Sequence, residues 1–128
     1  MAIVEMTKDN IDPIINSNAM VIIDFWAPWC GPCRSFAPTF ESTSENFPDV
    51  VFAKVNTDDE KELAGMFRIR SIPTLMIFRE QIIIFSDAGV LDGKSLTGLL
   101  NKARELDMDE VRKQIAESQE KSQAAPGA

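Results

Sequence analysis

Apolar and polar residues follow two spacings along this chain, and together they predict alternating strands and helices. Short runs rich in Val, Ile and Phe predict strands at 3–6, 20–26, 50–56, 74–78 and 82–85. Apolar residues at helical spacing predict helices that start at Asn10, cover 34–46, extend from 57–59 through Phe67, and start again at Asp92. Proline at position 38 lies inside the second of these helices and should bend it.

The order of these elements predicts the fold class. Early strands separated by helices favour parallel pairing, with helices on both faces of a sheet. The last two strands are close enough for a hairpin, which would place antiparallel strands at one edge. We therefore predict an α/β fold with a central mixed sheet of about five strands. Residues 79–81 of the hairpin contain no glycine, so we expect a longer or differently wound turn.

The C-terminal part differs in character from the rest. Residues 107–119 predict a further helix, capped by Asp107 and carrying a thin apolar stripe of Met108, Val111 and Ile115. Residues 120–128 are small and polar, and predict a disordered tail. The chain is thus divided into a domain at 1–106, a helical extension at 107–119 and a tail at 120–128.

Composition narrows the function classes. The formal net charge of -7 argues against nucleic acid or an anionic membrane as a partner. No apolar run approaches the roughly 18 residues of a membrane span, and the N-terminus shows no apolar signal segment. We therefore expect a reducing, cytoplasmic setting.

The chain has two cysteines, Cys30 and Cys33, within the sequence Trp29-Cys30-Gly31-Pro32-Cys33. They lie between a predicted strand and a predicted helix, and residues three apart share one face of a helical turn. Their Cα atoms should therefore lie within disulfide range. A bridge that closes a loop of about four residues contributes only about 2 kcal/mol, too little for a structural role. This spacing in a reducing compartment indicates catalytic or regulatory chemistry.

The position of each cysteine predicts its role. Cys30 stands at the helix start, where unpaired N–H groups and the helix dipole should lower the pKa of its thiol, so it should attack. Cys33 lies one turn further in and should resolve the resulting mixed disulfide. Pro32 fits the first helical turn, and Gly31 leaves the backbone open to a partner.

Three other interpretations of the cysteine pair are less favourable. A structural disulfide is disfavoured by the short loop. A structural zinc site needs four ligands, and the chain has two cysteines and no histidine, so we predict no metal. Two inert core cysteines fit poorly with Gly-Pro between them at a helix start.

Asp24 lies in the middle of an apolar strand, on the same face as Ile22 and Trp26. Burial of a carboxylate is costly and raises its pKa, so Asp24 could exchange a proton with Cys33. The alternative is an aspartate that caps a turn at the end of the strand.

Several motifs together match a known family. They are Asp24-Phe25-Trp26-Ala27, Trp29 through Cys33, Pro38, Lys54, Ile72-Pro73-Thr74 and Gly89. On these residues the chain resembles the thioredoxin family over about 3–105, which implies the thioredoxin fold.

The resemblance also implies roles for residues outside the cysteine motif. Lys54 corresponds to a buried partner of Asp24. Pro73 is expected to follow a cis peptide bond beside the cysteines, leaving the Ile72 backbone free to pair with a substrate strand. The residues expected to contact substrate are Trp29, Gly31, Pro32, Ile72, Pro73, Ala88 and Gly89.

These expectations define a protein-disulfide reductase. Its implied partners are disulfide-containing proteins and an NADPH-dependent flavin thioredoxin reductase, and the chain itself is expected to bind no cofactor. One alternative is a redox-sensing co-chaperone or binding module that uses the C-terminal extension. Another is an oxidant or isomerase of an oxidising compartment.

Overall fold

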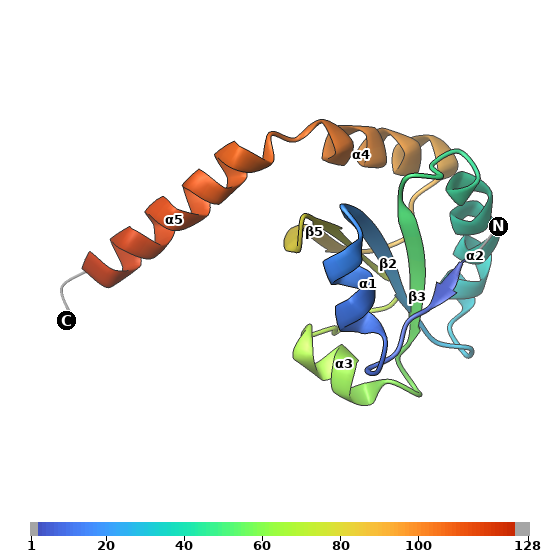
Figure 1. Ribbon diagram of the computed structural model, residues 1–128. Helices are drawn as coiled ribbons and strands as arrows, with labels where there is room; N and C mark the ends of the chain where they lie inside the picture. Colours follow the sequence, from blue (N-terminus) through green and yellow to red (C-terminus); the bar gives the residue numbers. More distant parts are fainter. Residues whose placement is uncertain (1–2, 125–128) are drawn as a thin grey trace.

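The computed structural model describes residues 3–124, in which a twisted sheet carries helices on both faces and one further helix projects away (Figure 1). The strand order is β1-β3-β2-β4-β5. Strand β3 pairs in parallel with β1 and β2, and β4 pairs antiparallel with β2 and β5. The predicted mixed five-stranded sheet is confirmed. Its strands are β1 (Val4–Glu5), β2 (Met20–Trp26), β3 (Val51–Asn56), β4 (Thr74–Arg79) and β5 (Ile82–Ala88).

Two apolar cores lie on opposite faces of the sheet. One contains Phe36 and Phe40 of α2 with Leu96 and Leu100 of α4, and the other contains residues of α1 and α3. The helices are α1 (Ile11–Ser17), α2 (Gly31–Ser44), α3 (Lys61–Met66), α4 (Gly93–Glu105) and α5 (Met108–Ala124).

Strand β2 is the centre of the molecule. Alternate side chains enter the two cores, Ile22 on the α2 and α4 side and Ile23 on the α1 and α3 side. Such double burial explains why its sequence is almost continuously apolar. It also makes the exception, Asp24, a fully buried carboxylate.

Two helices begin at other residues than predicted. The apolar spacing predicted α2 from Arg34, but the helix starts at Gly31 with Cys30 as its N-cap in extended conformation, which agrees with the expected place of Cys30 at the helix start. Gly31 and Pro32 therefore belong to the first turn, where proline needs no hydrogen-bond acceptor. Helix α3 starts at Lys61 rather than at 57–59, where Thr57 donates its N–H and its hydroxyl to the Trp26 carbonyl and the Asp58 N–H donates to Asn56 Oδ1.

The β4–β5 turn is short, and the prediction of a longer turn is wrong. It consists of Glu80 and Gln81, both at positive φ (49° and 72°). Two consecutive left-handed residues match the twist of paired strands, which is why this turn usually contains glycine. Here a tertiary contact supports it, since the Glu80 N–H donates to the Ala19 carbonyl at 2.8 Å.

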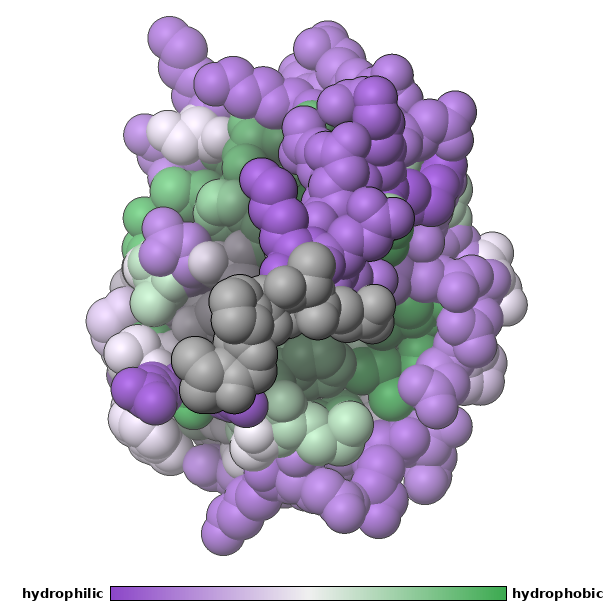
Figure 2. Space-filling model, turned by 90° about the vertical axis from the view of Figure 1, so that its left-hand side faces the viewer, coloured by the Kyte–Doolittle hydropathy of each residue, from purple (hydrophilic) through white to green (hydrophobic). Residues whose placement is uncertain are grey.

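Helix α5 is fixed at its base and free beyond it. Met108 is buried, and Arg112 pairs with Glu80. All residues from 112 to 121 are exposed, and the helix projects away from the domain (Figure 1). It is mostly hydrophilic, whereas hydrophobic side chains lie exposed on the domain beside it (Figure 2). Among residues 3–124, no helix is long and apolar enough to cross a membrane.

The helix continues to Ala124, so residues 120–124 are helical where disorder was predicted. The sequence from Gln119 to Ala124 contains neither glycine nor proline, so nothing in it interrupts the helix before Pro126. The rest of the predicted tail, 125–128, lies outside the described residues.

Candidate active site

The two cysteines lie at the junction between β2 and α2. They form a disulfide with a Cα–Cα distance of 5.2 Å. Cys30 is 5% exposed and Cys33 1%, so the outer and inner positions are as predicted. A partner molecule can reach Cys30 more readily than Cys33.

The start of α2 directs N–H groups at the outer sulfur. The Cys33 N–H donates to Cys30 Sγ at 3.2 Å, and the first turn of α2 contains no acidic residue. The unpaired N–H groups and the dipole of this helix favour negative charge at that sulfur once the disulfide is reduced.

Asp24 is a buried carboxylate without a hydrogen bond. Its exposed fraction is 0%, and neither oxygen has a hydrogen-bond partner within residues 3–124. Burial raises the pKa of Asp24 to about 7, and the charge of Lys54 lowers it by a smaller amount. Asp24 can therefore hold or release a proton near neutral pH.

Lys54, which the resemblance implied as a buried partner of Asp24, is near that carboxylate but not fully buried. It is opposite Asp24 in the β2–β3 register, but its side chain is only half-buried. Its Nζ lies 4.4 Å from the centre of the Trp26 ring, a cation–π contact. Within residues 3–124 it forms no ion pair with Asp24, so it acts on that carboxylate only through its charge.

The loop before β4 lies next to Cys30. The peptide bond between Ile72 and Pro73 is cis, and the Ile72 carbonyl oxygen lies 3.9 Å from Cys30 Sγ. Gly89, at φ +122°, donates its N–H to the Pro73 carbonyl at 2.9 Å. The Ile72 N–H has no hydrogen-bond partner among the described residues.

The remaining predicted contact residues surround this point. Trp29 is 67% exposed, Pro32, Ala88 and Gly89 are exposed, and Gly31 is half-buried. Asp58, which was not predicted as a site residue, accepts a hydrogen bond from Trp29 Nε1 at 3.1 Å. Its sequence context suggested only a helix start, so no local signal could have revealed this contact.

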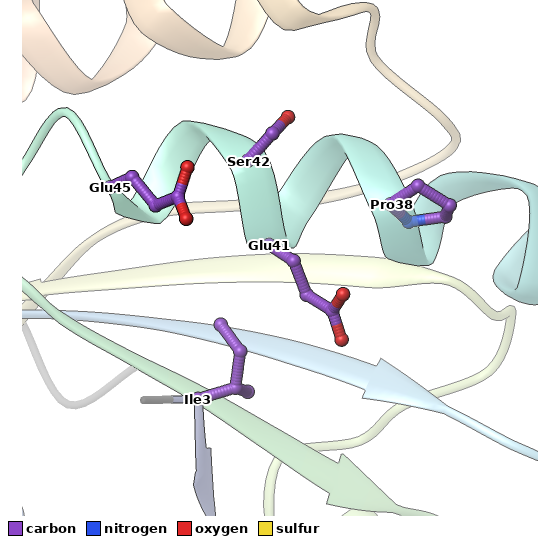
Figure 3. Close-up of a pocket in the computed structure, with 5 residues that line it drawn as sticks. All are labelled: Ile3, Pro38, Glu41, Ser42 and Glu45. Atoms are coloured by element: carbon purple, nitrogen blue, oxygen red, sulfur yellow. The ribbon is translucent and has the colours of Figure 1, made fainter. Parts of the chain in front are cut away.

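A pocket of about 570 Å³ lies away from the cysteines, between α2 and Ile3, the residue before β1. Figure 3 shows Glu41 of α2 and Glu45, the residue that follows this helix, on the side of the pocket opposite Ile3. None of the residues that line it is a cysteine or a predicted site residue, so it is separate from the site described here.

Comparisons with known proteins agree with this geometry. The family model for Thioredoxin matches residues 2–102. A protein of Streptomyces coelicolor named Putative thioredoxin 2 is 53% identical over 116 residues, covering 91% of this chain and 87% of that protein. Because 106 residues precede the extension, this alignment includes part of it. Thioredoxin 1 of Synechococcus elongatus is 41% identical over 90 residues, covering 70% and 84%.

Solved structures give the same fold. Plasmodium falciparum thioredoxin has a TM-score of 0.73 at 33% identity, covering 78% of this chain and 98% of that one. A mutant thioredoxin of Halobacterium salinarum has a TM-score of 0.75 at 28% identity, covering 84% and 98%. The chain belongs to the thioredoxin family. With its cysteine pair at disulfide distance, it is a thiol–disulfide oxidoreductase that reduces protein disulfides.

Proposed function

We propose that Cys30 attacks and Cys33 resolves. In the reduced chain, the Cys30 thiolate attacks one sulfur of a substrate disulfide, forming a mixed disulfide and releasing one substrate thiolate. Cys33 then attacks the Cys30 sulfur, forming the Cys30–Cys33 disulfide and releasing the second substrate sulfur. The substrate gains two electrons, and this chain loses them. The position of Cys30 as N-cap of α2, with Cys33 buried one turn behind it, carries the proposal.

Asp24 is proposed to accept the proton of the Cys33 thiol as Cys33 becomes a nucleophile. A carboxylate with a pKa of about 7 and no hydrogen-bond partner has the capacity for that proton at neutral pH. Lys54 then stabilises the ionised form of Asp24 through its charge, without direct contact.

Substrate is proposed to bind along the Ile72–Pro73 loop. The free Ile72 N–H suits a hydrogen bond to an extended substrate segment, as in the addition of a strand. The exposed Trp29 ring and the backbone at Gly89 would contact the same segment from either side.

The return of electrons to the chain is proposed to come from an NADPH-dependent flavin thioredoxin reductase, as the family resemblance implies. The chain would thus carry electrons between that enzyme and disulfide proteins in the cytoplasm, and so contribute to redox homeostasis. It would bind no nucleotide itself.

Cysteine substitutions test the proposal. Cys30→Ser should abolish reduction of a model disulfide protein, because the attacking sulfur is gone. Cys33→Ser should instead accumulate a covalent mixed disulfide, detected by mass spectrometry and released by dithiothreitol. The matched control is Ser35→Ala, an exposed position on the same helix, with unchanged turnover expected. Turnover by Cys30→Ser would contradict the role given to Cys30.

Helix α5 favours a second function, partner binding by the C-terminal extension. Residues 113–121 are all exposed on a helix that projects away from the domain, and they present a continuous helical surface (Figure 1). Such a surface suits a binding module, whose activity would be separable from that of the cysteines.

A further inference from the structure

Two arginines stand out on the loop between α3 and β4. Arg68 and Arg70 are both exposed, and within residues 3–124 neither side chain forms an ion pair or a hydrogen bond. The chain as a whole has a net charge of -7, so two unpaired positive charges side by side are unusual in it. The same loop continues directly into Ile72 and Pro73, beside Cys30.

The backbone of Arg68 shows that this position is costly for arginine. Its φ is +54°, in the left-handed region. The Arg68 N–H donates to the Gly65 carbonyl at 3.1 Å, and the Ile69 N–H donates to the Ala64 carbonyl at 2.9 Å. This pair of bonds ends α3 in a Schellman motif, where the left-handed residue is most often glycine. Arginine is therefore kept at this position at a cost to the backbone.

A pocket of about 220 Å³ lies against this loop. Residues 67–71 line one part of it, and residues of β4 and β5 line the rest. Ala88, one of the expected substrate contacts, belongs to the lining, so the pocket adjoins the substrate site. Among its described lining residues Asp87 is the one carboxylate, and its Oδ1 accepts the Ala88 N–H at 3.0 Å.

We propose that Arg68 and Arg70 form a recognition site for an acidic side chain close to the disulfide of a substrate protein. The proposal rests on the function proposed above, because it assigns a specificity to that same site. A guanidinium binds a carboxylate through two parallel hydrogen bonds. Two unpaired guanidiniums in a pocket that includes Ala88, on the loop that leads to Ile72, favour substrates with Asp or Glu next to the disulfide. The arginines position substrate and take no part in the exchange of sulfur bonds.

Two disulfide peptides provide the test. They share one intramolecular disulfide and differ only in Glu or Gln at the residues that flank each cysteine. The second-order rate constant for reduction is measured at low and high salt. The wild-type chain should reduce the Glu peptide faster, and added salt should diminish the advantage.

Loss of Arg68 should remove much of this preference. Arg68→Gly should slow reduction of the Glu peptide by about threefold, the typical effect of one exposed ion pair, and leave the Gln peptide unchanged. Arg68→Gly with Arg70→Gln should slow the Glu peptide on the order of tenfold. Arg68→Lys should retain part of the preference, because the charge is kept and the fork of donors is lost.

The glycine variant also separates recognition from folding. Glycine suits a positive φ, so Arg68→Gly should melt at or above the wild-type temperature. The matched control is Gln81→Gly, which also places glycine at a left-handed position but lies beyond the far end of β4. It should leave both rate constants unchanged.

Three outcomes would contradict the proposal in different ways. Equal wild-type rates for the two peptides would overturn it, and so would equal slowing of both peptides by Arg68→Gly, which would indicate a structural role. Failure of the wild-type chain to reduce either peptide would overturn the proposed function, and the recognition site with it.

Discussion

The buried carboxyl group of Asp24 links stability to pH. Below about pH 4 it is protonated in both the folded and the unfolded chain, and its burial carries no charge penalty. As the pH rises from the ordinary pKa of 3.8 to about 7, the unfolded chain releases this proton while the folded chain retains it. The free energy of unfolding therefore falls across this interval, and the loss is complete above about pH 7.

Asp24→Asn should therefore stabilise the oxidised chain, and more so at high pH. The difference between 3.8 and about 7 corresponds to about 4 kcal/mol as an order of magnitude. Denaturant unfolding at pH 5 and pH 8 measures the effect, with exposed Asp59→Asn as control. An equal gain at both pH values would contradict burial of the charge as its cause.

Asp24→Asn should also slow the resolution of the mixed disulfide, although the variant remains folded. Without a proton acceptor near neutral pH, Cys33 should resolve the mixed disulfide at least about tenfold more slowly. Single-turnover kinetics would detect the intermediate. A variant that is both more stable and equally fast would contradict the proposed role of Asp24.

At the scale of elements, the turn of the β4–β5 hairpin holds a left-handed residue whose backbone strain a substitution could remove. Gln81 is exposed and left-handed, so Gln81→Gly should raise the free energy of unfolding by about 0.5–1 kcal/mol. Thermal unfolding measures it, and unchanged reductase activity is expected because the turn lies at the end of β4 opposite Pro73. A lower melting temperature would show that side-chain contacts of Gln81 matter more than its backbone.

The elements whose signals are local were predicted best. Apolar runs located all five strands, and Asp92 caps α4 as expected, accepting the Ser95 N–H at 2.7 Å. Apolar spacing alone indicated that α2 begins at Arg34, whereas the chemistry of Cys30 and Pro32 correctly placed the helix start before Gly31. The short hairpin turn was missed because its support comes from Ala19, which is distant in sequence.

In the active site, too, the features with local sequence signals were predicted and those that depend on contacts between separate elements were not. The cysteine pair follows from spacing alone, and the burial of Asp24 follows from its place in an apolar strand. The half-exposed position of Lys54, the bond from Trp29 to Asp58, and the unpaired state of Arg68 depend on how separate elements meet. No local pattern contains that information.

At the scale of the whole molecule, α5 divides into an anchored base and a free outer part. A chain that ends after Arg112 should keep its reductase activity and lose less than about 0.5 kcal/mol of stability, because residues 113–121 are exposed. Met108→Ala should instead cost about 2 kcal/mol, since that side chain is buried at the base. Unfolding and turnover assays on the two variants measure the contrast.

The shortened chain also tests the second function. Unchanged turnover together with weaker binding to a partner protein would support a binding role for α5. Lost turnover would contradict the separation of the two parts.

The chain contains two tryptophans and no tyrosine. Trp26 packs against the cysteine cluster, and Trp29 immediately precedes Cys30. Almost all of the chain's ultraviolet emission therefore originates beside the one bond that changes during turnover. A fluorimeter could follow each opening and closing of that bond in real time, with no dye attached.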